Sequence, residues 1–195
     1  EIIAEMIAQE TNADLFKIEP VEDYPVTYDE CVALAKQEKE SNARPEIKGD
    51  IDIDKYDVIF VGYPIWWSDM PMPVYTFLEA HQYEGKTIIP FCTHEGSGLA
   101  NTENYLRNVC KGAEVLNGLA IRGRIAQNEQ EKAKEEVENW LESTVEKQFG
   151  EHIKEVIKAK LLELGIDSVL VQAQDKGALD YTIRARIEAA VARGL

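Results

Sequence analysis

The chain has 195 residues, of which 45% are hydrophobic and 29% are charged, and its formal net charge at pH 7 is −15. This length suits one hydrophobic core, or one core with a small appended unit. An acidic body repels phosphate backbones, so we expect no nucleic-acid partner. The sequence has no run of about 18 apolar residues, so we expect no membrane partner either.

Four stretches have the composition of β-strands. In chain order they are residues 13–18, 57–62, 87–92 and 114–121. The second and third are continuous apolar runs, which is typical of strands that are covered on both faces. Apolar residues at helical spacing predict helices between and after these strands, at residues 2–11, 28–40, 74–78, 105–109 and 137–145. This alternation predicts an α/β fold with a doubly wound parallel sheet.

The last part of the chain differs from the rest in charge. Residues 143–195 hold equal numbers of acidic and basic side chains, so the whole net charge lies in residues 1–142. The apolar spacing in this tail predicts a helix–strand–helix extension, with a helix at 152–164, a strand at 167–174 and a helix at 178–192. We therefore expect two parts of different origin, 1–142 and 143–195.

Three cysteines, Cys31, Cys92 and Cys110, are scattered along the chain. They form no C-x-x-C pair, and the histidines do not cluster with them. This pattern predicts reduced thiols in a cytoplasmic protein, with neither a disulfide framework nor a metal site.

Two loops follow neighbouring strands of the predicted sheet. Residues 62–69 carry a Trp-Trp pair and residues 93–98 carry Gly-Ser-Gly. Ligands of doubly wound sheets bind at the carboxyl ends of the strands, near these loops. A Trp pair can stack on a flat ring, and glycines let the backbone approach its polar edge. Each motif alone also fits a structural role, as core, interface or plain loop.

Three stretches in a fixed order carry a family resemblance, at residues 56–67, 70–74 and 85–98. Together they resemble the flavodoxin-like family of FMN-binding proteins, over about residues 1–141. The resemblance implies electron transfer or FMN-dependent reduction with an unidentified redox partner or small-molecule acceptor. It assigns no catalytic residue, and His94 and Glu95 could equally face solvent. The implied cofactor-binding residues are Pro64, Ile65, Trp66, Trp67, Thr93, His94, Glu95, Gly96, Ser97 and Gly98.

Members of this family begin with a strand and a Ser/Thr/Gly-rich loop that holds the FMN phosphate at a helix N-terminus. This sequence opens within a predicted helix, so we expect a sheet that is incomplete at its N-terminus and FMN binding that is weak or absent. The tail strand at 167–174, followed by the turn at Gly177, has the order needed to fill the vacant position. The alternative hypothesis is that the tail folds separately from the sheet.

The tail resembles the C-terminal half of the acyl carrier (gamma) subunit of citrate lyase, over about residues 143–194. In that family the prosthetic arm hangs from a serine near the subunit's N-terminus, a segment that this stretch does not contain. Tyr181 stands where a cysteine is usual. The alternatives to an FMN protein are therefore a carrier-related module and a chimeric scaffold without activity.

Overall fold

The computed structural model describes residues 1–166, 187, 188 and 190–192, and the side chains of residues 145–154 are not described. The chain divides into two compact units, Glu1–Glu138 and Asn139–Leu195. The tail strand expected at 167–174, and most of the helix expected at 178–192, lie outside the described residues. So does the proposed insertion of that strand into the sheet.

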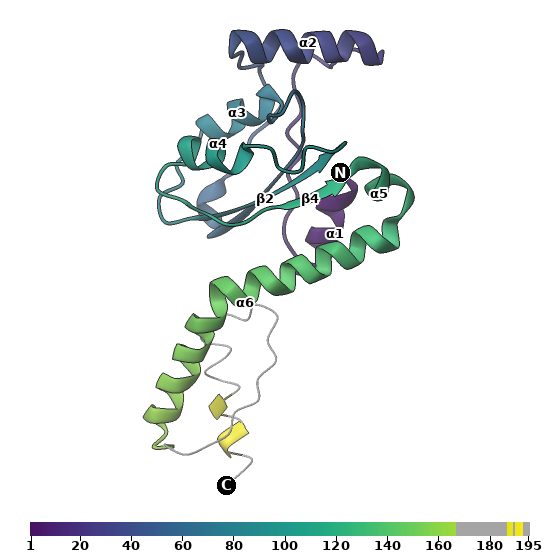
Figure 1. The fold of residues 1–195 in the computed structure, drawn as a ribbon. Coiled ribbons are helices and arrows are strands. Elements are labelled where there is room, and N and C mark those ends of the chain that lie inside the picture. Colours follow the sequence, from purple (N-terminus) through teal and green to yellow (C-terminus); the bar gives the residue numbers. More distant parts are fainter. Residues whose placement is uncertain (167–186, 189, 193–195) are drawn as a thin grey trace. The chain divides into compact units, whose positions relative to one another are not determined.

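The first unit contains a parallel sheet, as the alternating pattern predicts (Figure 1). Strand β1 (Val58–Pro64) pairs with β2 (Thr87–His94), in a register that runs from Val58 opposite Thr87 to Pro64 opposite Thr93. The opposite edge of β2 pairs with β3 (Glu114–Val115) and with β4 (Leu119–Arg122).

The single strand expected at 114–121 is interrupted between β3 and β4. The interruption lies opposite Pro90, between the β2 residues Ile88 and Phe91 that pair with β3 and β4. Proline has no N–H to donate to a ladder. Pro90 therefore cannot take part in regular hydrogen bonding with a neighbouring strand on each side of β2.

The strand expected at residues 13–18 does not form, and this expectation is wrong for the described residues. These residues have no assigned strand, and the nearest pairing is an isolated bridge between Pro20 and Ile47. A strand exists only when a partner satisfies its backbone groups, and an apolar run does not supply that partner.

Six helices and one short 3-10 helix accompany the described sheet. Helices α1 (Ile2–Thr11), α2 (Tyr28–Ser41), α3 (Met72–Glu79) and α4 (Thr102–Val109) fall where the apolar spacing predicts them. The pattern did not predict α5 (Gly123–Asn128) or the 3-10 helix at Ile53–Lys55. The two helices expected at 137–145 and 152–164 are one continuous helix, α6 (Gln130–Glu163).

The core of the first unit lies on both faces of its sheet. Val61, Tyr63, Ile88 and Cys92 alternate along β1 and β2 and pack in one cluster with the buried residues of α3 and α4. Ile89 and Phe91 alternate with these β2 residues and are also buried, outside that cluster. Successive side chains of a strand point to opposite faces, so α3 and α4 cover one face. The buried side chains of α1, α5 and the start of α6 belong to the other, and Figure 1 shows α1 beside α5.

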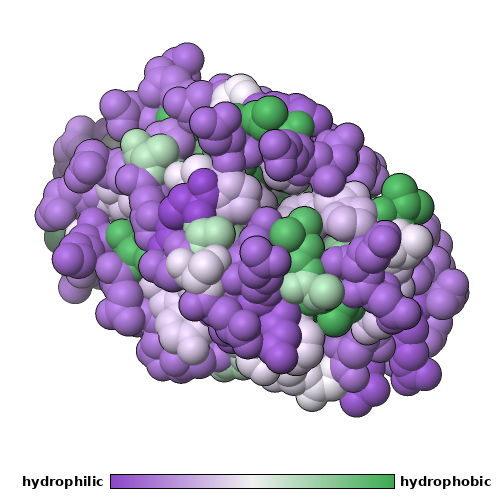
Figure 2. All heavy atoms as spheres, turned by 90° about the horizontal axis from the view of Figure 1, so that it is seen from above, coloured by the Kyte–Doolittle hydropathy of each residue, from purple (hydrophilic) through white to green (hydrophobic). Residues whose placement is uncertain are grey.

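The molecular face drawn in Figure 2 is mainly hydrophilic, with hydrophobic residues in small separate groups. Among the described residues, no helix combines the length and apolar character that crossing a membrane requires.

Candidate functional site

The structure brings the two loops together at the carboxyl ends of β1 and β2. Pro64 lies opposite Thr93 in the ladder, and the N–H of Ile65 continues it by donating to the Thr93 carbonyl at 2.8 Å. The loops that follow, at residues 64–69 and 93–98, therefore start side by side. This is the edge at which an α/β sheet binds its ligands.

The Trp-Trp loop is a tight turn. The backbones of Trp66 and Asp69 exchange two hydrogen bonds, of 2.9 and 3.0 Å. The two residues between them, Trp67 and Ser68, both have positive φ, of 52° and 62°. Glycine or asparagine normally occupies such positions, and other residues there cost on the order of 1 kcal/mol or more each. Strain of this kind clusters at functional sites, which supports a role for the turn beyond packing.

Asp69 fixes this turn from inside the protein. Its side chain is buried, and its Oδ1 accepts from the Met70 N–H at 2.7 Å and from the Tyr75 hydroxyl at 2.8 Å. The ammonium of Lys39, on α2, lies 3.8 Å from its Oδ2. Burial, with a further contribution from Asp69, raises the pKa of Tyr75 well above its usual range, so this phenol stays a donor.

The two tryptophans also contact α2 and the segment that precedes it. The indole N–H of Trp67 donates to the Val32 carbonyl at 3.1 Å, and Lys39 donates to the Trp67 carbonyl. Trp66 instead forms a T-shaped ring pair with Tyr24, which precedes α2, with centroids 5.0 Å apart. Trp67 is thus partly committed to α2, although 47% of its surface is exposed, while Trp66 is half-buried.

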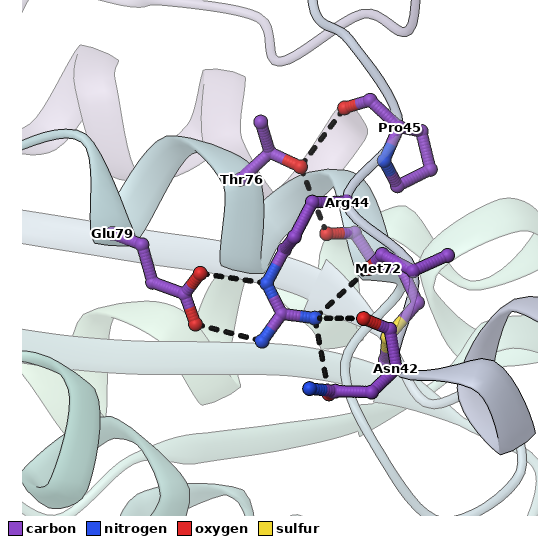
Figure 3. A network of polar contacts seen from close by, with 7 residues as sticks. Asn42, Arg44, Pro45, Met72, Thr76 and Glu79 are labelled. Atoms are coloured by element: carbon purple, nitrogen blue, oxygen red, sulfur yellow. Dashed lines mark hydrogen bonds and ion pairs between the residues drawn. The ribbon is translucent and has the colours of Figure 1, made fainter.

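The segment that follows α2 is fastened to α3 by Arg44 (Figure 3). The guanidinium forms a two-pronged contact with the Glu79 carboxylate, at 2.7 Å for both nitrogens. It also donates to the Asn42 and Ala43 carbonyls, at 3.0 and 2.8 Å. Thr76 of α3 donates to the Pro45 carbonyl at 2.9 Å. These contacts fix where α2 ends, and so where it meets the Trp-Trp turn.

The second loop is organised by His94. Its ring nitrogen Nδ1 accepts from the N–H of Gly96 at 2.8 Å and from the N–H of Gly98 at 3.1 Å. Both glycines have positive φ, and a Cβ on either would enter open space. The carboxylate of Glu95 turns toward the start of α5, where it occupies the space that a Cβ on Gly123 would need. His94 is therefore an internal part of the loop, which the sequence left open.

The two buried cysteines are not reactive nucleophiles. Cys92, in β2, and Cys110, after α4, are buried, and burial raises the pKa of each thiol to about 12. Both thiols are therefore protonated at neutral pH. Among the described residues, no group of three or more His, Cys, Asp or Glu side chains is placed to hold a metal ion.

Sequence reasoning missed the residues that hold the turn, namely Tyr24, Lys39, Asp69 and Tyr75. Asp69 ends the quoted 62–69 stretch and could have been recognised as a turn residue, because Asp often bonds nearby backbone N–H groups. The other three lie in parts of the chain whose positions relative to the turn are decided by the fold.

A parallel sheet with helices on both faces, and two ligand-type loops at its carboxyl edge, define a protein of the flavodoxin-like class. Residues 1–144 match the family model described as flavodoxin. This match covers most of the sequence, and the chain belongs to the flavodoxin family. Residues 126–194 match a second family model, described as the malonate decarboxylase delta subunit (MdcD).

Two solved structures illustrate the likeness of the first part. A candidate flavoprotein from Bacteroides eggerthii has a TM-score of 0.61 and 27% identity, over 73% of this chain and 88% of that one. A flavoprotein from Lactobacillus acidophilus, crystallised in complex with FMN, has a TM-score of 0.52 and 22% identity, over 65% of this chain and 87% of that one. The second shows a shared fold alone.

Curated relatives match the C-terminal part. The citrate lyase acyl carrier protein of Streptococcus uberis is 64% identical over 53 residues, which are 27% of this chain and 52% of the relative. The citrate lyase acyl carrier protein of Lacticaseibacillus casei is 62% identical over 53 residues, which again are 27% of this chain and 52% of the relative. The chain thus spans about half the length of these relatives, and it carries a segment similar to their family.

Proposed function

We propose that this chain binds the ring of FMN at the carboxyl edge of β1 and β2 and acts in electron transfer or FMN-dependent reduction. The observation that carries the proposal is the pair of loops placed side by side by the bond from Ile65 to Thr93. The L. acidophilus structure, which holds FMN, and the B. eggerthii candidate flavoprotein support it.

The residues at this edge fit a flat ring with a polar rim. Trp66 supplies aromatic surface, and open space adjoins Gly96 and Gly98. The backbone N–H groups of Glu95 and Ser97 have no hydrogen-bond partner within the described part of the chain. Such donors suit carbonyl and nitrogen acceptors on a ring. When bound, FMN would supply the redox chemistry, and these residues would hold and orient its ring.

A titration of the full chain with FMN and, in parallel, with riboflavin tests the proposal through flavin fluorescence. The described residues at this edge offer contacts for the ring, which both ligands share, so we expect both to bind. No change in fluorescence with either ligand would overturn the proposal.

The similarity of the tail to citrate lyase acyl carrier proteins supports a second candidate, a carrier-related module. The matched segment spans about half of those relatives, so we propose that this chain carries no covalent acyl arm. Intact-mass analysis after co-expression with the enzymes that modify citrate lyase should give the unmodified mass. A mass increment on any tail residue would contradict the proposal.

A further inference from the structure

We infer that His94 is a positioning residue, which shapes the 93–98 loop for a flavin through Nδ1 and does not act on the ligand directly. The inference rests on the proposed function, because it concerns the same edge of the sheet.

The arrangement of His94 copies a common turn. An Asn or Asp side-chain oxygen often accepts the backbone N–H two residues later, and Nδ1 of His94 does the same with Gly96 at 2.8 Å. The same nitrogen also accepts from Gly98, four residues later, at 3.1 Å. One ring nitrogen therefore accepts hydrogen bonds from two backbone N–H groups, and these bonds hold the 93–98 loop in its turn.

These bonds determine which ring nitrogen of His94 carries a proton and which backbone N–H groups of the loop are free to bind a ligand. A nitrogen that accepts hydrogen bonds carries no proton, so the neutral ring holds its proton on Nε2. The N–H groups of Gly96 and Gly98 are already used, which removes them from the donors that the sequence assigned to the flavin. The N–H groups of Glu95 and Ser97 remain available for it.

Two substitutions separate the roles of the two ring nitrogens. His94→Asn keeps an acceptor close to the position of Nδ1 and removes the Nε2 proton. His94→Gln moves its polar group toward the position of Nε2 and removes the loop acceptor. We expect the asparagine variant to bind flavin within about threefold of the wild type. The glutamine variant should bind on the order of tenfold more weakly, because two hydrogen bonds that shape the loop are lost.

A measurement without flavin tests the same point independently. Nitrogen-15 NMR of the full chain should show Nδ1 of His94 without a proton, and slow hydrogen exchange at the amides of Gly96 and Gly98. The protection should survive in His94→Asn and disappear in His94→Gln. Protection that is unchanged in His94→Gln would overturn the inference, as would equal losses of flavin affinity in both variants. If the wild type binds no flavin, the proposed function fails while the exchange data still decide the role of His94.

Discussion

The hydroxyl of Tyr75, on α3, donates a hydrogen bond of 2.8 Å to the buried carboxylate of Asp69, which closes the Trp-Trp turn. Through this contact the turn that carries the candidate ring-binding residues is tied to a helix of the core. Lys39 adds a tie to α2 through the second carboxylate oxygen, at 3.8 Å. The turn is thus fixed by residues from two helices that neighbour it in space.

The first prediction concerns this tie. Asp69→Ala leaves the Tyr75 hydroxyl and the Met70 N–H without their acceptor, so we expect the free energy of unfolding to fall by about 1–3 kcal/mol. Tyr75→Phe removes one donor only and should cost about 1 kcal/mol. Urea denaturation measures both. If Asp69→Ala costs no more than Tyr75→Phe, Asp69 is not the anchor of the turn.

The second prediction concerns the tryptophans. Replacing Trp66 and Trp67 together with Ala should weaken flavin binding by about tenfold or more, because ring stacking contributes roughly 0.5–1.5 kcal/mol beyond burial for each pair. Fluorescence titration measures it, and Trp140→Ala, on α6, is the control. Unchanged affinity in the double variant would contradict the site. Trp67→Phe, which removes the bond to the Val32 carbonyl and shrinks the ring over which Lys36 lies, should lower stability by about 1 kcal/mol.

The third prediction concerns pH. The hydrogen bond from Arg44 lowers the pKa of Glu79, so this carboxylate loses its proton more readily in the folded than in the unfolded protein. The stability that it contributes is therefore present at neutral pH and is lost as the pH falls through its folded-state pKa. Glu79→Gln should lower the free energy of unfolding by about 0.2–1 kcal/mol at pH 7, since the pair is partly exposed.

That difference between wild type and Glu79→Gln should shrink toward zero as the pH falls through the folded-state pKa of Glu79, which lies below its usual value, because the wild-type carboxyl then becomes neutral too. Glu22→Gln is the control, because Glu22 is exposed and has no ion pair among the described residues. A difference that stays constant from pH 7 to pH 3 would show that charge at Glu79 is not what stabilises the contact.

The fourth prediction concerns the contact between β1 and β2. A Cβ on Gly62 would lie 2.0 Å from Cζ of Phe91, so Gly62→Ala forces the ring to move. We expect a loss of about 1–3 kcal/mol by denaturant unfolding, as for other overpacked cores. Phe91→Leu shortens the obstacle, so the double variant should be more stable than the sum of the two single losses predicts. Strict additivity would contradict the proposed clash.

The sequence by itself predicted the alternation of strands and helices, and it located α1, α2, β1 and β2 to within a few residues. It also predicted that the two loops follow neighbouring strands. These features depend on local spacing: apolar side chains recur with the period of the element that they bury. A continuous apolar run such as the centre of β2 is enough to indicate a strand covered on both faces.

Only the tertiary structure decided which of these elements find partners. Residues 13–18 have the composition of a strand and form none, whereas the stretch at 114–121 is divided opposite Pro90, a residue that belongs to another strand. Likewise, the composition of the 93–98 loop does not reveal that Nδ1 of His94 occupies two of its N–H groups. A hydrogen bond depends on where both the donor and the acceptor lie in space. Spacing along the sequence indicates the local structure around one of these groups, but it does not show where the partner lies.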